Sequence, residues 1–159
     1  MLRLVIPQRQ YKKSFLQAYQ EFLDKGENKG FLGYDSLKDL ADNFPRYVAR
    51  TKKWAKGLSL PKGHIPATHY WLVDGNEYIG EVSIRHRLTK KLKELGGHIG
   101  YGIRPSKRRK GYGTRLLALA LKKARLLGIE RILITCDEDN IGSRKIIEPN
   151  GGVLKDDIH

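Results

Sequence analysis

Residues 100–114, Gly-Tyr-Gly-Ile-Arg-Pro-Ser-Lys-Arg-Arg-Lys-Gly-Tyr-Gly-Thr, constrain the fold of this chain more than any other segment. They predict a short strand, a basic loop and then a helix that begins at a pair of glycines. The first backbone N–H groups of a helix have no partner within it, and the helix dipole makes this end attractive to anions. Gly111 and Gly113 lack Cβ atoms, so a phosphate group can approach the main chain closely. With three basic residues at 108–110, the segment predicts a cradle for phosphate or pyrophosphate.

Two familiar phosphate-binding motifs are excluded by spacing. No run of the P-loop form Gly-x-x-x-x-Gly-Lys-Ser/Thr occurs in the chain. A dinucleotide fingerprint would place a third glycine where Pro105 stands, directly before a helix. What remains is the pattern Arg/Gln-x-x-Gly-x-Gly, which Arg108, Gly111 and Gly113 satisfy. A solvated basic loop that caps an ordinary helix is the alternative interpretation of the same residues.

The order of the predicted elements indicates a mixed α/β fold with no repeats or linkers. Strands are expected at residues 2–6, 70–73, 78–84, 98–104 and 131–136, with a turn of Asp-Gly-Asn joining the second and third and a last short strand after Gly152. Helices are expected at 11–23, 36–56, 90–95 (one turn), 111–127 and 140–148, with Pro45 interrupting or restarting the second. Ser36 is expected to cap that helix. Residues 98–136 then form a βαβ unit.

These elements and motifs resemble the GNAT superfamily of acyl-CoA-dependent N-acetyltransferases over nearly the whole chain, taken as one domain of residues 1–159. A later helix in that family often reads Asn-x-x-Ala/Ser-x-x-x-Tyr-x-x-x-Gly, which Asn140, Ser143 and Gly151 match while Ile147 replaces the tyrosine. The stretch 98–113 is similar to a poorly characterised bacterial branch of predicted acetyltransferases. The resemblance implies a mixed, mostly antiparallel central sheet flanked by helices, whose βαβ unit carries the CoA-binding loop. The family's usual final strand is expected to be missing, and the free sheet edge favours a homodimer.

The resemblance also implies acetyl-CoA as the acyl donor. Its pyrophosphate is expected to bind main-chain N–H groups of the loop and helix start, at Arg108, Arg109, Lys110, Gly111, Tyr112, Gly113 and Thr114. Pantetheine is expected to bind the strand backbone around Gly102 and Ile103 and, at its far end, Asn140 and Ser143. A strand N–H would serve as the oxyanion hole. Helix capping is the alternative role for Asn140.

The implied reaction is direct attack of an amine on the thioester, which requires a deprotonated amine. A lysine-like amine with a pKa of ~10.4 is almost wholly protonated at neutral pH, so a general base is useful. His98 stands near the position where the family often has a glutamate, and Glu81 on the preceding strand is the other candidate. Because Ile147 cannot donate a proton to the leaving thiolate, Tyr101 is the candidate acid, with Tyr112 as a second tyrosine nearby.

Composition narrows the partners without naming them. The chain carries 31 Lys plus Arg against 17 Asp plus Glu, a net charge of +14 that favours polyanions such as coenzyme A and keeps nucleic acid open as a partner. No apolar run is long enough to span a membrane, and a single cysteine, Cys136, is consistent with a reducing cytoplasm. No metal site is expected. The acceptor is expected to be a small-molecule or peptide amine, in a pocket drawn from residues 25–50 and 58–69. The alternative function is a non-catalytic module that binds CoA or nucleic acid.

Overall fold

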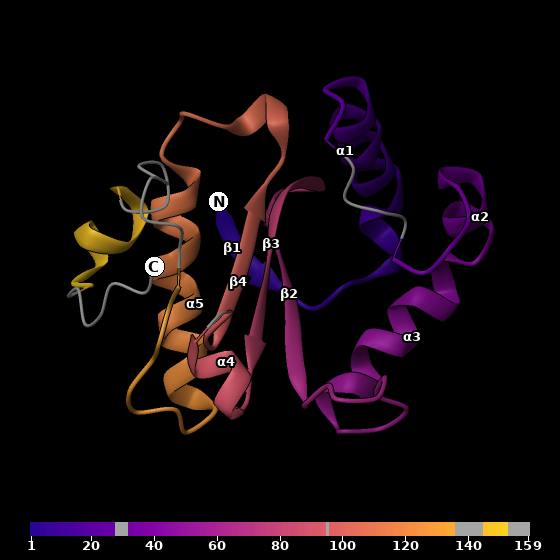
Figure 1. Ribbon diagram of the computed structural model, residues 1–159. Helices are drawn as coiled ribbons and strands as arrows, with labels where there is room; N and C mark the ends of the chain where they lie inside the picture. Colours follow the sequence, from indigo (N-terminus) through magenta and orange to yellow (C-terminus); the bar gives the residue numbers. More distant parts are fainter. Residues whose placement is uncertain (28–31, 95, 136–144, 153–159) are drawn as a thin grey trace.

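A four-stranded antiparallel sheet organises the part of the chain that the computed structural model describes, residues 1–27, 32–94, 96–135 and 145–152. Its strands follow one another in sequence order: β1 (Leu2–Val5), β2 (Ala67–Asp74), β3 (Glu77–Arg85) and β4 (Ile99–Ile103). Figure 1 shows the sheet between two helical layers, with α1 (Lys12–Asp24), α2 (Leu37–Asp42) and α3 (Phe44–Ala55) on one face and α5 (Tyr112–Leu126) on the other. The predicted fold class, a mostly antiparallel sheet flanked by helices, is confirmed.

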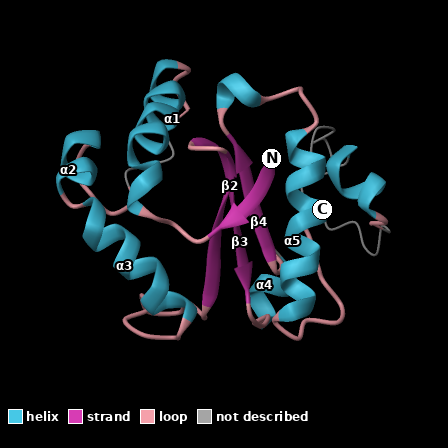
Figure 2. Ribbon diagram, turned by 180° about the vertical axis from the view of Figure 1, so that it is seen from behind, coloured by secondary structure: helices cyan, strands magenta, loops and turns pink. Residues whose placement is uncertain are grey.

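Alternation of side chains along β2 explains the two-sided core. Trp71 and Val73 pack with the helices α1, α2 and α3, whereas Leu72 between them packs with α5. On the first face, Phe15 of α1 stacks on Trp71 with ring centroids 4.5 Å apart and planes 18° apart. The view from behind in Figure 2 shows the same sandwich of helices around the sheet. Helices therefore cover both faces of the sheet.

Local signals set the ends of the helices as the sequence predicts. The Ser36 hydroxyl accepts a hydrogen bond from the backbone N–H of Asp39 (3.0 Å) and so caps α2. Pro45 lies in the first turn of α3, and Asn43 separates the two helices. The single helical turn expected at residues 90–95 is α4 (Lys90–Glu94), and a short 3-10 helix, η1 (Arg9–Tyr11), precedes α1. The prediction that Pro45 restarts the helix is confirmed.

The predicted strand at residues 131–136 is wrong for residues 131–135, which the structure describes without a strand assignment. One backbone hydrogen bond joins them to the start of β4, from the N–H of His98 to the carbonyl of Leu133 (2.8 Å). The N–H of Leu133 then donates to the imidazole Nδ1 of His98 (3.0 Å). A side chain thus takes the place of the next backbone acceptor, and a regular ladder does not form. The second strand of the predicted βαβ unit is accordingly not assigned in this range.

Some predictions lie outside the described residues. These are the last strand after Gly152 and most of the helix at 140–148, with Cys136, Asn140 and Ser143. The described residues 145–147 are helical and lead into a 3-10 helix, η3 (Glu148–Asn150). Across the described ranges, no helix combines the length and apolar character needed to cross a membrane.

Candidate functional site

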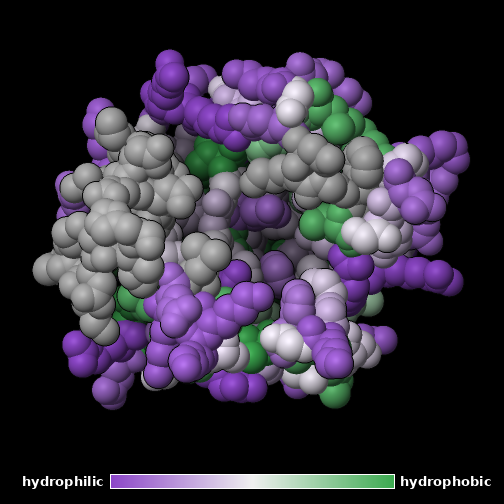
Figure 3. All heavy atoms as spheres, viewed as in Figure 1, coloured by the Kyte–Doolittle hydropathy of each residue, from purple (hydrophilic) through white to green (hydrophobic). Residues whose placement is uncertain are grey.

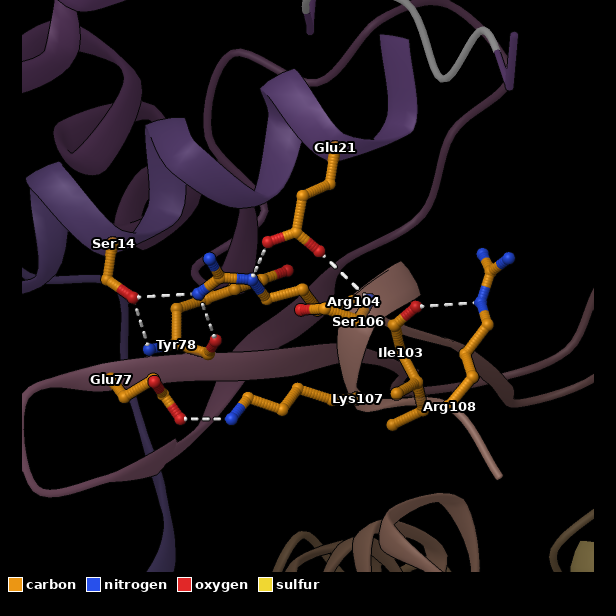
Figure 4. A network of polar contacts seen from close by, with 9 residues as sticks. All are labelled: Ser14, Glu21, Glu77, Tyr78, Ile103, Arg104, Ser106, Lys107 and Arg108. Carbon is orange, nitrogen blue, oxygen red and sulfur yellow. Dashed lines mark hydrogen bonds and ion pairs between the residues drawn. The ribbon is translucent and has the colours of Figure 1, made fainter. Parts of the chain in front are cut away.

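The end of β4 and the following loop are tied to α1 by a buried ion pair. Glu21 accepts hydrogen bonds from Nε of Arg104 (2.6 Å) and from the backbone N–H of Ser106 (2.9 Å). The Arg104 guanidinium also donates to the Ser14 hydroxyl and the Tyr78 carbonyl (Figure 4). The Arg104 and Glu21 side chains are only 11% and 25% exposed. The position of the 3-10 turn η2 (Pro105–Lys107) therefore depends on α1.

Arg108 is held by a second carboxylate from the end of α1. Its guanidinium makes two parallel hydrogen bonds to Glu27 (2.7 and 2.8 Å), and its Nε donates to the Ile103 carbonyl (3.2 Å). The same group lies over the ring of Phe22, 5.6 Å from its centroid. Hydrogen bonding to Glu27 raises the pKa of Arg108, so its charge is fixed and largely neutralised by this pair. Arg108 thus shapes the loop, while the charge left open to a ligand comes from its neighbours.

The next residues present unpaired backbone donors at the start of α5. Arg109 and Gly111 adopt left-handed backbone conformations, with φ of 60° and 81°. Among the described residues, no side chain caps α5, and the N–H groups of residues 112–114 have no backbone acceptor. The side chains of Arg109 and Lys110 are exposed beside them. Successive N–H groups in such a turn, at the positive end of a helix dipole, are suited to hold a phosphate group.

The two glycines of the motif serve different purposes. A Cβ at Gly111 would meet nothing within 4 Å, so glycine is required there by the positive φ and leaves the loop open. Gly113 is buried, and its Cβ would lie 2.5 Å from Cδ1 of Ile146. The missing side chain of Gly113 therefore makes room for Ile146, which corrects the expectation that it makes room for phosphate. Beyond it, the Thr114 carbonyl accepts a hydrogen bond from Asn150 (3.1 Å).

The outer edge of β4 exposes backbone groups next to this loop. Gly100 and Gly102 lie opposite Ser83 and Glu81 of β3. Hydrogen bonds from Arg85 N–H to the His98 carbonyl and from Arg104 N–H to the Ile79 carbonyl bracket these pairs. Because backbone groups alternate in direction along a strand, those of Tyr101 and Ile103 point away from β3. No further strand pairs with this edge among the described residues.

A cavity of about 470 Å³ lies between α3 and the face of β2, β3 and β4. Its polar side chains include Arg50 and Thr51 of α3, His69 of β2, and Glu81 and Ser83 of β3. Trp54 lies at its wall, as does Gly100, whose hydrogen faces open space. Figure 3 shows this side of the molecule hollowed near its middle, with hydrophilic residues inside the hollow. Part of this lining falls within residues 25–50 and 58–69, the ranges expected to form the acceptor pocket: Leu32, Gly33, Tyr47, Arg50, Pro61 and His69.

The charge of Glu81 affects the pKa values of three tyrosines. Burial, and then the charge of Glu81, raise the pKa values of Tyr19, Tyr47 and Tyr78 above the usual range. These hydroxyls therefore stay neutral. Burial, followed by the charges of two arginines, lowers the pKa of His69, which is thus a neutral imidazole at pH 7. The cavity accordingly offers the carboxyl group of Glu81 and the neutral imidazole of His69 as candidate proton acceptors.

His98 has a different position from the one that a general base needs. It is 7% exposed, does not line the cavity and uses Nδ1 to accept from Leu133. Burial, with the charge of Arg85, lowers its pKa. The neutral ring therefore carries its proton on Nε2, and its basic nitrogen is occupied. The structure brings Glu81 to the cavity wall. Tyr101 also borders the cavity, but its side chain lies on the same face as Val82 and packs against the core on the α5 side of the sheet, and His98 makes a structural contact with Leu133.

Sequence reasoning missed the residues that act from a distance along the chain. Glu21 belongs to α1 and Glu27 follows it by three residues, and their pairing with the loop is not visible in any local pattern. Arg50 and His69 line the cavity but stand in segments with no diagnostic motif. The only available signal was the alternation of β2, which places His69 on the same face as Trp71. Within the described residues, no cluster of His, Cys, Asp or Glu is suited to hold a metal ion.

Comparison with known proteins identifies a family model and several solved structures, all of them acetyltransferases. A family model described as an acetyltransferase (GNAT) domain matches residues 28–153. Three solved structures resemble the chain, and each is under 25% identical to it. RimL, a ribosomal L7/L12 alpha-N-protein acetyltransferase in complex with coenzyme A, has a TM-score of 0.65 and 19% identity over 98% of this chain and 81% of its own. The microcin C7 self-immunity acetyltransferase MccE, in complex with acetyl-CoA and AMP, has a TM-score of 0.62 and 16% identity over 94% and 78%.

The third structure is an acetyl transferase from Salmonella typhimurium that modifies the N-terminal serine of the 50S ribosomal subunit protein L7/L12. It has a TM-score of 0.59 and 21% identity over 94% of this chain and 79% of its own. No curated protein matches the sequence. At these identities the structures establish a shared fold, and the family model covers more than half of the chain.

Proposed function

Because the chain belongs to the GNAT acetyltransferase family, we propose that it transfers an acetyl group from acetyl-CoA to a primary amine of a small molecule or peptide. The observation that carries this proposal is the open anion site at the start of α5, which lies beside the outer edge of β4, where no further strand pairs among the described residues. RimL and MccE, which share the fold, are named as complexes with coenzyme A and acetyl-CoA. The uncapped N–H groups and the left-handed turn at Arg109 and Gly111 fit the diphosphate of such a donor.

When bound, acetyl-CoA supplies an acetyl group activated as a thioester. The N–H groups of residues 112–114 bind its pyrophosphate, with Arg109 and Lys110 adding charge. The outward backbone groups of Tyr101 and Ile103 hold its pantetheine arm along β4. The N–H of Tyr101 is the donor available to stabilise negative charge on the acetyl oxygen. The strand β4, which holds the donor in this proposal, adjoins the cavity described above.

Glu81 is the general base in this proposal, in preference to His98. It lines the cavity from β3, directly opposite Gly102 of β4, so its carboxylate adjoins the strand that holds the thioester. It accepts the proton that the attacking amine must lose, either directly or through water. The leaving thiolate needs no acid from the protein and takes its proton from solvent, because a thiol with a pKa near that of cysteine, ~8.5, is a tolerable leaving group; the Tyr101 side chain, expected to be the acid, packs on the α5 side of the sheet. His69, one strand further away on β2, faces the acceptor rather than the donor.

Acetyl-CoA binding is tested by calorimetry with two variants that make the same change of charge. Lys110→Glu alters an exposed residue beside the start of α5, whereas Lys122→Glu alters an exposed residue on the same helix, well past its first turn. Reversing a charge at a helix start is expected to weaken affinity by about 3- to 30-fold. Lys122→Glu is expected to bind within about twofold of the wild type. Equal affinity of the two variants contradicts the assigned site.

Turnover is then measured as release of the free CoA thiol with a panel of amines. Glu81→Gln is expected to lower kcat/KM by about 10²- to 10⁴-fold at neutral pH while leaving acetyl-CoA affinity unchanged. His69→Gln is the matched control from the same cavity and is expected to have a smaller effect. Binding without turnover of any amine would identify the protein as a non-catalytic CoA-binding module. A larger loss in His69→Gln would move the base to His69.

A further inference from the structure

Arg50 is a cation held at the wall of the cavity by aromatic rings. It projects from α3, and its guanidinium carbon lies 4.6 Å from the ring centroid of Trp54 and 5.6 Å from those of Tyr34 and Tyr47. Stacking of this kind fixes the plane of a guanidinium without using its N–H donors. The charge is therefore placed at one position beside the cavity, with its donors available in that plane.

Few hydrogen bonds from the Arg50 guanidinium to other described residues are formed. One terminal nitrogen donates to the carbonyl of Leu32, while Nε is buried and has no hydrogen-bond partner within the described ranges. In the same part of the chain, no carboxylate forms an ion pair with Arg50. Buried polar atoms in proteins are almost always paired, and a buried charged donor without a partner is costly. The charge of Arg50 therefore has no anionic partner within the described ranges, and an anion in the cavity that this residue lines would supply one.

Among the described residues that line the cavity, Arg50 is the cation without a carboxylate partner. The other arginine that acts on His69, Arg85, donates to the carbonyls of Gly96 and Gly97 (3.1 and 2.9 Å). Glu81 lies on the β3 wall of the same cavity, opposite β4. The cavity thus has a positive group on its α3 side and a negative group on its sheet side. A molecule with an amine at one end and an anion at the other matches this arrangement.

We propose that the acceptor is an amine that also carries a carboxylate, and that Arg50 binds this carboxylate while the amine faces Glu81. Guanidinium and carboxylate groups are complementary in geometry and can form two parallel hydrogen bonds. The proposal rests on the acetyltransferase function above and specifies its substrate class. The carboxylate has two sources, the α-carboxylate of a free amino acid and a side-chain carboxylate of a peptide.

Matched acceptors separate these sources. L-amino acids are compared with the corresponding amino acid amides, and short peptide amides that contain glutamate are compared with those that contain glutamine. In the wild type, at least one of these pairs is expected to show a preference of about 10- to 100-fold in kcat/KM for the carboxylate member. A preference in the first pair identifies the α-carboxylate, and a preference in the second identifies the side chain.

Three variants of α3 connect the preference to Arg50. Arg50→Gln is expected to reduce it to within about threefold, and its thermal midpoint is measured to show that the variant is folded. Arg46→Gln makes the same change of charge at an exposed position of the same helix and is expected to keep the preference. Arg50→Lys, which retains the charge, is expected to restore part of it.

Equilibrium binding of the same acceptors, measured by calorimetry without acetyl-CoA, gives a readout independent of turnover. Carboxylate members are expected to bind the wild type and Arg46→Gln more tightly than Arg50→Gln. If amines are acetylated but acids and amides react equally, the proposal is wrong and the acetyltransferase function stands. If no amine reacts, the binding comparison alone decides: loss of carboxylate binding in Arg50→Gln supports the proposal, and equal binding overturns it.

Discussion

Glu21 accepts hydrogen bonds from both Arg104 and the Ser106 backbone, so Glu21→Gln tests whether α1 holds the phosphate-binding loop in place. The glutamine has nearly the same shape, but only one of its terminal atoms can accept. One of the two donors must then face an NH₂ group, and a hydrogen bond to a charged partner is lost. Such bonds contribute about 1.5–3 kcal/mol each. Because Arg104 and Glu21 are 11% and 25% exposed, water replaces the lost bond poorly.

We therefore expect the free energy of unfolding to fall by about 2 kcal/mol, out of about 5–15 kcal/mol for a typical domain. Urea unfolding measures this directly, and the thermal midpoint is expected to drop by about 4–8 °C. Glu77→Gln is the matched control. Its partner Lys107 (2.7 Å) belongs to the same loop, but Glu77 is 47% exposed, so a loss of less than about 1 kcal/mol is expected.

The pH dependence of the same pair provides a second check. Burial acts to raise the pKa of Glu21, but hydrogen bonds from Ser106 and Arg104 and the charge of Arg104 lower it below 4.5 overall. A carboxyl whose pKa is lower in the folded state stabilises the protein above its ordinary pKa and loses that contribution as the pH falls through the folded value. The deficit of Glu21→Gln should shrink from pH 7 to pH 4. A deficit equal to that of Glu77→Gln, or one independent of pH, would refute the reasoning.

Three further predictions about the loop and its surroundings can be checked by urea unfolding. Gly111→Ala should cost about 1–2 kcal/mol because alanine disfavours the positive φ there, and a neutral result would show that the turn relaxes. Gly113→Ala should destabilise by steric contact with Ile146, and Ile146→Val, which removes Cδ1, should recover part of the loss; absence of any recovery would exclude this contact as the cause. His98→Asn should lower the free energy of unfolding at pH 7.5, because the pKa of His98 is lowered and its neutral form accepts a hydrogen bond from Leu133. The difference in stability from the wild type should narrow as the pH falls below about 6.5, since protonation of His98 then destabilises the wild type. A difference that does not change with pH would contradict this.

The elements that the sequence predicted are those with a local physical cause. Ser36 caps α2 through a residue only three positions away, and Pro45 begins a helix because its ring suits the first turn. The basic loop likewise follows from its own residues, since Gly111 adopts the left-handed conformation that glycine favours. Alternating and helical spacing gave the strands and helices to within a few residues of their ends.

The predictions that failed depend on contacts between distant segments. Residues 131–136 are apolar enough for a strand, but the strand pattern at 131–135 is replaced by bonds to His98, which no local pattern encodes. Gly113 resembles a phosphate-binding glycine, and only the packing of Ile146 shows its role. The carboxylates of Glu21 and Glu27 and the place of Arg50 were hidden for the same reason, because contacts between distant segments leave no continuous motif.

The two tryptophans of this chain lie in different surroundings, and this gives the protein two optical reporters. Trp71 is 1% exposed and stacks on Phe15 in the layer between the sheet and α1. Trp54 lies at the cavity wall beside Arg50, and its indole N–H donates to the Ser59 carbonyl (3.1 Å). Fluorescence of Trp54→Phe would follow the folding of the core alone. Fluorescence of Trp71→Phe would report on occupancy of the cavity, so one technique can follow folding and ligand binding separately in a pair of single-tryptophan proteins.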